Sequence, residues 1–267
     1  MASAGPRFPA PPVTTTDALK ALALLLILID HVGHFLAPDW PILRVIGRLG
    51  APIFFFLIGF ARSRDIPWRW LALGLLLTCV DYLWLGRLTD LQLNILFNFA
   101  LIRLVLPHAE RFLDRSLARL ALVLSGCLLA MPVVNPWLEY GPEGWLFALF
   151  GLLRRRSLED GPSWFLPRDL AGMVAFVAYA VIEQQDYAFS LPMTALLLPG
   201  LAGIFLILRD FERGDTRLQP PAGLRVILRF CGRHSLEIYA VQIVLLAALG
   251  SLWSTGGGNN ETGDGDE

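Results

Sequence analysis

Long apolar blocks, separated by short segments rich in Pro, Gly or charged residues, fill most of the chain. A helix needs about 20 mostly apolar residues to cross the hydrocarbon layer of a membrane. By this rule the chain has nine candidate spans, at residues 17–37, 42–62, 67–86, 91–107, 116–134, 142–153, 168–184, 190–208 and 233–253. The pattern predicts an all-α, polytopic transmembrane helix bundle of about nine spans, within a range of eight to ten. The sixth block is short enough to be a tilted, re-entrant or partly buried segment instead.

The arginines support this topology and orient it. The alternate loops on one side, with the span ends beside them, contain Arg62, Arg64, Arg69, Arg111, Arg115, Arg154, Arg155, Arg156, Arg168, Arg209, Arg213, Arg217 and Arg225. The opposite loops contain a single arginine, Arg87, and run over residues 38–41, 87–90, 135–141 and 185–189. Because basic residues accumulate in cytoplasmic loops, we expect the N-terminus in the cytoplasm. We interpret the longest arginine-rich segment, 209–232, as a polar loop too short for a core of its own.

Composition agrees with a membrane protein and narrows the choice of partners. The chain is 55% hydrophobic and 17% charged, whereas about a quarter of the residues in a soluble domain are charged. We therefore expect the lipid bilayer as its surroundings, and a net charge of −1 gives no indication of a nucleic-acid partner. Cys79, Cys127 and Cys231 have no paired spacing, so neither a disulfide framework nor a metal site is predicted.

The domain organisation predicted from these patterns is simple. Residues 1–15 are rich in Pro and Ala and lack the apolar core of a signal peptide, so we expect a disordered cytoplasmic segment before an uncleaved first span. Residues 16–253 form one transmembrane domain without internal repeats. Residues 254–267 are Gly-rich and acidic and are expected to form a disordered tail.

Ionisable residues are concentrated in the first span. Inside a membrane each of them is costly unless it is paired or hydrated, so each is a functional candidate. Asp17 and Lys20 lie at the expected cytoplasmic end, and Asp30, His31 and His34 lie near the outer end. Lys20 and His31 are separated by close to three helical turns, so they share a face and lie about 16 Å apart along the axis.

The second span adds Arg44 and Arg48 near its outer end, one turn apart. A histidine such as His31 is the usual proton acceptor in acyl transfer. A carboxylate such as Asp30 can orient the ring, and an arginine can stabilise developing oxyanion charge. Alternatively, Asp30, Arg44 and Arg48 form a buried ion-pair network that holds two helices together, while His34 is simply hydrated.

Further polar residues are predicted at a similar depth. Asp81, Asn94 and Asn98 could line the same cavity, although interhelical hydrogen bonding is an alternative for the asparagines. Residues in or beside an outer loop are expected to be hydrated: Glu139, Tyr140 and Glu143. The chain has no Walker A, dinucleotide-binding, zinc-protease or nucleophile-elbow motif, which argues against the usual ATP-driven pumps, dinucleotide enzymes and zinc proteases.

Two stretches carry a resemblance to a known family. DALKALALLLILIDHVGHF (17–35) is followed by RVIGRLGAPIFFFLIGFARSRD (44–65). Their order of Asp-x-x-Lys, Ile-Asp-His-x-Gly, Arg-x-Ile-Gly-Arg and Pro-Ile-Phe resembles the opening of the TraX family of membrane proteins, which is associated with pilin N-acetylation. NILFNFAL (94–101) is also TraX-like. GRHSLEIYAVQIVLL (232–246) resembles the last spans of this family and of the more distantly similar acyltransferase-3 family.

The resemblance implies roles for several residues. His31 would be the catalytic base or acyl relay, and Lys20, separated from it by ten intervening residues, would hold the phosphates of an acyl-CoA. Asp30, Arg44 and Arg48 would form the polar core of the family. One departure is Gln242, which stands where these families often have a histidine, and it leaves any role for a second histidine open.

We therefore expect a membrane-embedded acyltransferase in the bacterial cytoplasmic (inner) membrane. It would transfer an acetyl group from acetyl-CoA, without a metal, to an amine or hydroxyl of a pilin-like peptide, a glycan or a lipid. The alternative is a proton-coupled transporter or a non-catalytic membrane protein, in which Asp30 and His31 relay protons or pack. Transporters often contain internal repeats and broken helices, and the sequence shows no repeat.

Overall fold

The computed structural model describes residues 12–83, 92–216 and 220–257, with side chains through residue 252. Within these ranges the chain forms helices and no sheet. The helices are α1 (Thr15–Phe35), α2 (Pro41–Gly47), α3 (Ala51–Phe60), α4 (Trp68–Leu83), α5 (Ile95–Leu113), α6 (Leu117–Val134), α7 (Gly141–Glu159), the 3-10 helix η1 (Pro162–Trp164), α8 (Phe165–Tyr187), α9 (Leu191–Arg209), α10 (Ala222–Arg233) and α11 (Ser235–Gly257). The predicted disordered ends fall largely outside the described residues.

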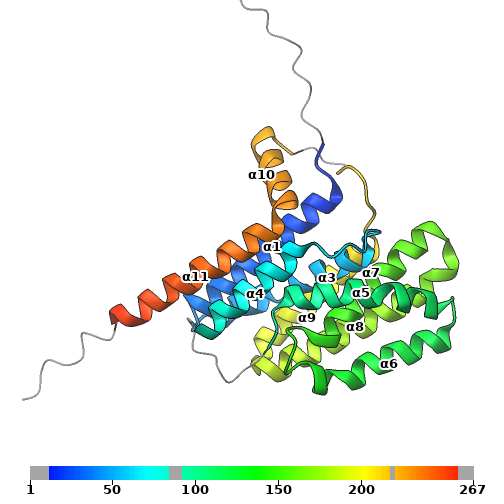
Figure 1. Cartoon of the computed structure of the whole chain (residues 1–267), viewed down its shortest axis with the longest axis horizontal. Coiled ribbons are helices and arrows are strands. Elements are labelled where there is room, and N and C mark those ends of the chain that lie inside the picture. The colour runs from blue at the N-terminus through cyan, green and yellow to red at the C-terminus, as the bar shows by residue number, and fades with distance from the viewer. Residues whose placement is uncertain (1–11, 84–91, 217–219, 258–267) are drawn as a thin grey trace, which may run out of the picture.

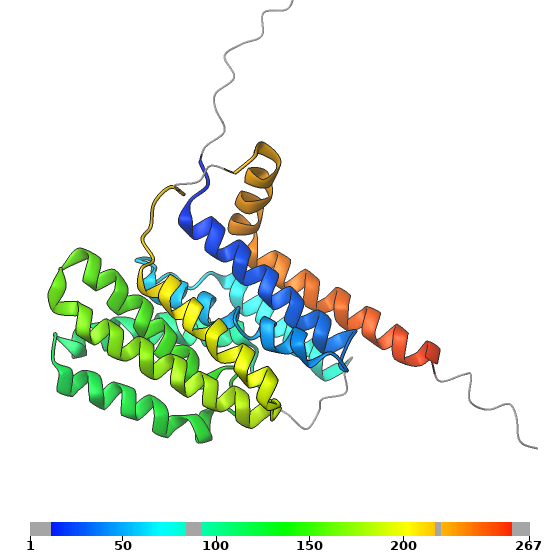
Figure 2. The same cartoon turned by 180° about the vertical axis from the view of Figure 1, so that it is seen from behind.

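The helices form two packed groups that meet at α2 and α3 (Figures 1 and 2). In the first group α1 lies alongside α11 and also contacts α2 and α10. In the second group α7 is central and packs against α3, α5, α6 and α8, while α9 covers α8 and reaches back to α2. α4 contacts both α5 and α11 and so bridges the two groups.

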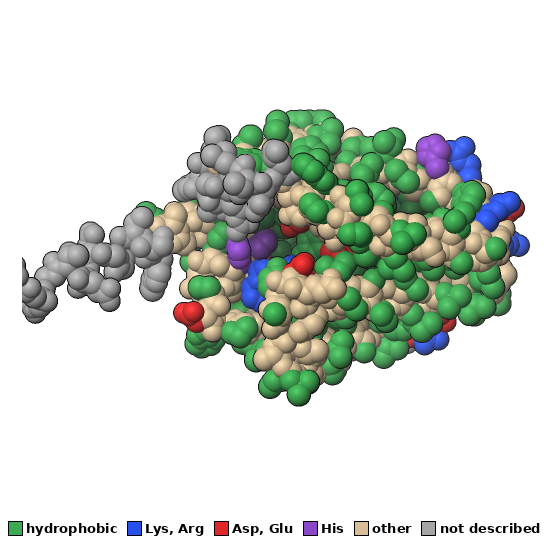
Figure 3. Space-filling model, turned by 90° about the horizontal axis from the view of Figure 1, so that it is seen from below, with side chains coloured by type: hydrophobic (Ala, Val, Ile, Leu, Met, Phe, Trp, Pro, Cys, Tyr) green, Lys and Arg blue, Asp and Glu red, His purple; other side chains and the backbone are tan. Residues whose placement is uncertain are grey.

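In the described part of the chain, six helical segments are long and apolar enough to cross a membrane. They are α1, α2 with α3, α6, η1 with α8, α9, and α11. Many large apolar side chains are exposed, and Figure 3 shows a face of the molecule that is mostly apolar. The chain is therefore an integral membrane protein built as a helix bundle. The other three predicted blocks lie in α4, α5 and α7, which within the described residues do not meet both the length and the apolarity needed for a span.

One segment follows an alternative of the prediction, and two differ from it. The short block at 142–153 is part of the longer α7, most of whose side chains are buried because helices surround it, as the partly buried alternative expected. The second block is broken into α2 and α3. The segment 209–232, expected to be a loop, contains most of α10.

α3 and α7 pack so closely that their backbones touch. A β-carbon at Gly151 on α7 would overlap the carbonyl oxygen of Phe56 on α3. Beside this contact the rings of Phe56 and Phe150 pack edge to face, with centroids 5.2 Å apart. Lipid is as apolar as leucine, so helices in a membrane depend on close van der Waals contact, which small residues permit. Gly151, together with Gly59 on α3, where a β-carbon would overlap the carbonyl of Ala148, thus allows α3 to lie against α7.

The break between α2 and α3 has a local cause and a distant partner. Pro52 has no amide hydrogen, and its ring displaces the carbonyl four residues earlier, which belongs to Arg48. The hydroxyl of Tyr179 on α8 donates a 2.8 Å hydrogen bond to that freed carbonyl. Broken backbone is tolerated at membrane depth where other protein groups satisfy it. α8 therefore stabilises the break and holds Arg48 in place.

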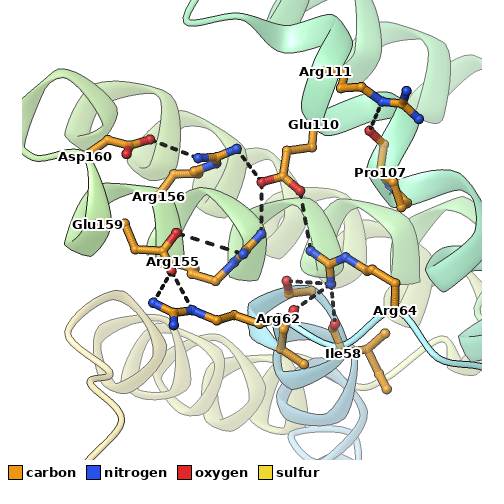
Figure 4. A network of polar contacts seen from close by, with 12 residues as sticks. Ile58, Arg62, Arg64, Pro107, Glu110, Arg111, Arg155, Arg156, Glu159 and Asp160 are labelled. Carbon is orange, nitrogen blue, oxygen red and sulfur yellow. Dashed lines mark hydrogen bonds and ion pairs between the residues drawn. The ribbon is translucent and has the colours of Figure 1, made fainter.

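A charge cluster joins the helices at the arginine-rich end of the bundle (Figure 4). Glu110 on α5 is its centre, at 3.0 Å from Arg155 and 2.7 Å from Arg156 on α7. Arg64, in the segment between α3 and α4, lies 3.7 Å from the other oxygen of Glu110. Around one carboxylate the cluster thus ties α7 to α5 and to the end of α3.

We expect Gly151→Ala to lower the free energy of unfolding by about 1–3 kcal/mol, because the added methyl group must push α3 away. Gly126→Ala on α6 is the matched control, since nothing lies within 4 Å of a β-carbon there. The higher helix propensity of alanine should stabilise that variant by up to about 1 kcal/mol. Thermal unfolding of both variants in detergent micelles compares them. Equal stability of the two variants would contradict the close contact between α3 and α7.

Candidate functional site

The carboxylate of Asp30 joins α1 to α2. Arg44 Nη1 lies 2.8 Å and Arg48 Nη2 lies 2.6 Å from Asp30 Oδ2, and Arg48 Nε donates to Oδ1 at 3.1 Å. The Asp30 side chain is 8% exposed and that of Arg48 is 9% exposed. Guanidinium and carboxylate groups match in shape, so the Arg48 pair is a strong, two-bond contact. The residues that the sequence offered as a buried ion-pair network are thus brought together.

Gly47 makes this arrangement possible. A β-carbon at Gly47 would overlap the backbone and the β-carbon of Asp30, so the two helices cross in direct contact here. Arg44 and Arg48 lie one turn apart on either side of this contact in the sequence RVIGR. Both side chains can therefore close over the same carboxylate from one end of α2.

Arg48 has further partners that come from the second helix group. Its Nη1 donates a 3.2 Å hydrogen bond to the hydroxyl of Tyr140, the residue before α7. On α8, Glu183 lies 3.6 Å from Arg48 Nε, and the ring of Tyr187 lies 4.8 Å from the guanidinium carbon. Tyr187 also accepts a 2.8 Å hydrogen bond from Arg44. The ion-pair cluster thus connects α1 and α2 with α7 and α8.

His31 follows Asp30 in sequence but faces α11. Its Nδ1 lies 3.4 Å from the amide nitrogen of Gln242, and its ring centroid lies 5.9 Å from that of Tyr239 and 6.2 Å from that of Phe35. The Asp30 carboxylate instead faces the arginines. Among the described contacts, Gln242 rather than Asp30 is therefore the polar side chain that meets the ring. Figure 3 shows histidine, basic and acidic side chains gathered around a hollow in the apolar face.

A cavity of about 360 Å³ lies towards the arginine-rich end, between α1, α3, α4, α5 and α11. Its cationic lining residues are Lys20, Arg69, Arg103, Arg213 and Arg233. Its one lining carboxylate, that of Glu237, lies 3.4 Å from Arg69. Much of the remaining lining is aliphatic or aromatic, and it includes Phe54, Phe60, Trp70, Phe99 and Tyr239. The cavity thus combines a cationic rim with an apolar interior.

This cavity follows one face of α1 towards His31. Thr16, Lys20 and Ile27 line it, and His31 is one turn beyond Ile27 on the same helix. Tyr239 lines the cavity and also contacts the His31 ring. Lys20 donates a 3.1 Å hydrogen bond to the carbonyl of Gly232. The unbroken α1 therefore gives Lys20 and His31 the shared face that their spacing predicted.

A second cavity, of about 670 Å³, lies between α6, α7 and α8. Its lining includes Tyr140, Glu143, Asn135 and Asp186. Glu143 Oε2 and Asn135 Oδ1 are buried without a hydrogen-bond partner among the described residues. The expectation that Tyr140 and Glu143 are hydrated loop residues is therefore wrong. Glu143 is 4% exposed, and Tyr140 is half-buried, because the segment before α7 folds into the bundle.

The two asparagines have different roles. Asn98 crosslinks α5 to the start of α7: its amide donates to the Glu139 carbonyl at 2.9 Å, and its oxygen accepts from the Trp145 indole at 2.8 Å. Asn94 instead caps the first turn of α5 by accepting from the Leu96 amide at 3.1 Å. Asn94 also forms a side-chain hydrogen bond with Tyr239 on α11, so interhelical hydrogen bonding describes both asparagines and helix capping is an additional role of Asn94.

Glu139, Asp81 and His34 complete the predicted polar set. Burial raises the pKa of Glu139, in the segment between α6 and α7, to about 7, although the Ile95 amide donates to it at 2.8 Å. Asp81 is half-buried near the end of α4. His34 is exposed near the end of α1, with its ring centroid 4.6 Å from that of Phe35.

A family model described as TraX protein matches residues 15–214, which is most of the chain. This chain belongs to the TraX family. The match runs from α1 through α9 and so includes Lys20, His31 and the whole Asp30 cluster. Gln242 and Tyr239, the α11 partners of His31, lie beyond it.

Curated relatives and solved structures add little to the TraX assignment. An uncharacterized protein, RP591 of Rickettsia prowazekii (strain Madrid E), is 46% identical over 44 residues. That stretch is 16% of this chain and 18% of the relative, so the chain covers less than a fifth of its length. No solved structure matches the chain.

Sequence reasoning missed several residues of the site in this TraX-family chain. Glu183 lay inside the predicted span 168–184, and an ionisable residue in a span was the signal that would have found it. Tyr187 is one turn beyond Glu183 and had no signal of its own. Tyr140 and Tyr239 gain their roles only from helices that are distant in sequence.

We expect Asp30→Asn to destabilise this TraX-family protein by about 3–5 kcal/mol, because two enclosed guanidinium groups lose their carboxylate. Adding Arg48→Met to Asp30→Asn should recover part of that loss. Glu237→Gln is the comparison: it removes a half-exposed pair with Arg69 and should cost at most about 1 kcal/mol. Thermal unfolding in detergent measures all three variants. If Asp30→Asn costs no more than Glu237→Gln, the cluster does not hold α1 and α2 together.

Proposed function

We propose that this protein is a membrane-embedded acyltransferase that moves an acetyl group from acetyl-CoA to an amine or hydroxyl acceptor. The observation that carries the proposal is the cavity with a cationic rim that follows the Lys20 face of α1 towards His31. Membership of the TraX family, which is associated with pilin N-acetylation, supports it. We further propose that the arginine-rich end faces the cytoplasm of a bacterium and that the bundle lies in the inner membrane.

The rim and interior of the cavity suit an acyl-CoA. Its nucleotide phosphates need cationic partners, and four arginines and Lys20 line the cavity. Its pantetheine arm and short acyl group need a narrower, mainly apolar passage, which the aromatic lining provides. A volume of about 360 Å³ lies within the usual range for small-molecule sites, about 300–1,000 Å³. In this proposal the nucleotide stays at the rim and the thioester points inwards.

His31 would act as the proton acceptor. Its Nδ1 faces Gln242, whose amide can present either its NH₂ group or its oxygen. When the oxygen faces the ring, Nδ1 carries the proton and Nε2 has the free electron pair. The acceptor nitrogen or oxygen then bonds to the acyl carbon, and its proton passes to Nε2. As the carbon–sulfur bond breaks, that proton passes to the leaving thiolate.

The acceptor would approach from the opposite end of the bundle. The second cavity lies beside the Asp30 cluster, because Tyr140 both lines it and accepts from Arg48. The unpartnered oxygens of Glu143 and Asn135 in its wall favour a group that donates hydrogen bonds. Asp30 and Arg48, which are enclosed by each other and by α7 and α8, would act by positioning α1 and not by touching the acyl group.

One observation favours the rival transporter function. The second hydrophobic segment is broken between α2 and α3, next to buried charges, and broken helices beside a polar site are common in transporters. Substrate flux into proteoliposomes without acyl transfer would support that function.

We expect His31→Gln to lower the rate of transfer at least about a hundredfold, because a general base contributes about 10²–10⁴. The measurement follows label from acetyl-CoA to membrane or peptide acceptors, in inverted and right-side-out vesicles. His108→Gln, at an exposed histidine of α5, is the control and should keep wild-type activity. Full activity of His31→Gln would remove His31 from the mechanism. Absence of transfer in the folded wild type, together with substrate flux, would favour the transporter.

We expect Lys20→Gln to raise the KM for acetyl-CoA about tenfold with a smaller change in kcat, because one charged contact to phosphate is lost. Lys20→Arg should retain most of the affinity, since it keeps the charge at the rim. Initial rates over a range of acetyl-CoA concentrations distinguish the two parameters. An unchanged KM in Lys20→Gln would mean that the nucleotide does not bind at this cavity.

A further inference from the structure

α10 projects from the helix bundle and has one cationic face and one apolar face. It contacts α1 and α11 at the arginine-rich end. Its axis runs in a different direction from the axes of those two helices (Figures 1 and 2). With 12 residues it is too short to cross a membrane. It follows the segment 210–221 and leads directly into α11.

One face of α10 is cationic. Arg225, Arg229 and Arg233 follow one another at intervals of four residues, so they form a row along the helix. Residues 222–233 contain no acidic side chain. Arg233 already lines the cavity described above, whereas Arg225 and Arg229 are half-buried residues outside that lining.

The other face of α10 is apolar and uncovered. Leu224, Ile227 and Phe230 are 47%, 58% and 57% exposed, and their spacing of three residues places them on one side. In a membrane protein, exposed apolar side chains on the spans meet lipid. α10 lies at the end of those spans, where water would otherwise meet this face.

The attachment of α10 to α1 fixes its position. A β-carbon at Gly232 would overlap the carboxylate of Asp17, so the end of α10 lies directly on the start of α1. Lys20 donates to the carbonyl of Gly232 at 3.1 Å. α10 therefore begins away from the bundle and ends against the arginine-rich end of α1, which is where the membrane surface must lie if α1 spans.

We propose that α10 is an interfacial helix that binds the anionic surface of the cytoplasmic leaflet. Leu224, Ile227 and Phe230 insert between the upper parts of the acyl chains, and Arg225 and Arg229 contact phosphate groups of anionic phospholipids. A short helix with a cationic face and an opposite apolar face has the properties required for this position. The cytoplasmic leaflet supplies the complementary charge. This inference is independent of acyl transfer.

The full-length protein in lipid nanodiscs tests the depth of α10. Cys79, Cys127 and Cys231 are replaced by alanine, and single cysteines at Ile227, Phe230 or Arg229 carry an environment-sensitive fluorophore. Nanodiscs contain phosphatidylcholine with increasing fractions of phosphatidylglycerol. Brominated acyl chains quench probes inside the leaflet, and iodide quenches probes in water. Two positions calibrate the signals: Leu129, 78% exposed on the spanning helix α6, and Arg111, exposed at the arginine-rich end of α5.

We expect probes at Ile227 and Phe230 to be quenched by brominated lipid, like the probe at Leu129, and protected from iodide. The probe at Arg229 should show the intermediate pattern of a headgroup position. Quenching of all α10 probes by iodide alone, as at Arg111, would overturn the proposal. Protection from both quenchers would overturn it as well, because the apolar face would then be covered by protein.

The charge contribution is tested separately. We expect Arg225→Gln with Arg229→Gln to require a higher fraction of phosphatidylglycerol for the same lipid quenching at Phe230. Each arginine near an anionic surface contributes about fivefold in affinity. Arg111→Gln with Arg115→Gln removes the same charge from another part of the arginine-rich end and should leave the titration unchanged. Equal titrations for both pairs of variants would show that α10 does not recognise anionic lipid.

Discussion

The structure depends on one carboxylate held between two arginines in the interior of a membrane protein. Asp30 accepts from Arg44 and Arg48, and all three are largely removed from solvent. In low dielectric such charges are stable only together, because each one alone would carry a large desolvation penalty. The pairing therefore sets the rotation of α1 as well as its distance from α2. Successive residues of a helix point about 100° apart. With Asp30 turned towards α2, His31 is turned towards α11, where Gln242 meets it.

The same cluster lies where the two helix groups join. Arg48 stands at the break between α2 and α3, and Pro52 causes that break by freeing the Arg48 carbonyl. The hydroxyl of Tyr179 on α8 donates a hydrogen bond to this carbonyl, and the hydroxyl of Tyr140 before α7 accepts one from the Arg48 guanidinium. The backbone and the side chain of one residue are thus fixed by different helices of the second group. Because α3 packs closely on α7, the position of Arg48 is also fixed relative to the central helix of the second group.

The sequence predicted what depends on local composition. Each of the nine apolar blocks contains helix, and the spacing of Lys20 and His31 correctly predicted a common face. Features that depend on distant contacts could not be predicted in the same way. Tyr140 and Arg48 are 92 residues apart in the chain, and no periodicity indicates that they meet. α10 was missed for another reason: an amphipathic helix of 12 residues lacks the apolar length that marks a span.

The absence of a histidine at position 242 constrains the proposed chemistry. An amide can fix which ring nitrogen of His31 carries a proton, but it cannot accept and release a proton as an imidazole does. A mechanism that uses two histidines, one for each half-reaction, is therefore not possible with His31 and Gln242. The proton taken from the acceptor must return to the leaving thiolate through the His31 ring itself. Donor and acceptor would therefore have to meet that ring in one ternary complex. The cavity along α1 is consistent with this requirement on the donor side, because it follows the Lys20 face of that helix towards His31 and shares Tyr239 with it.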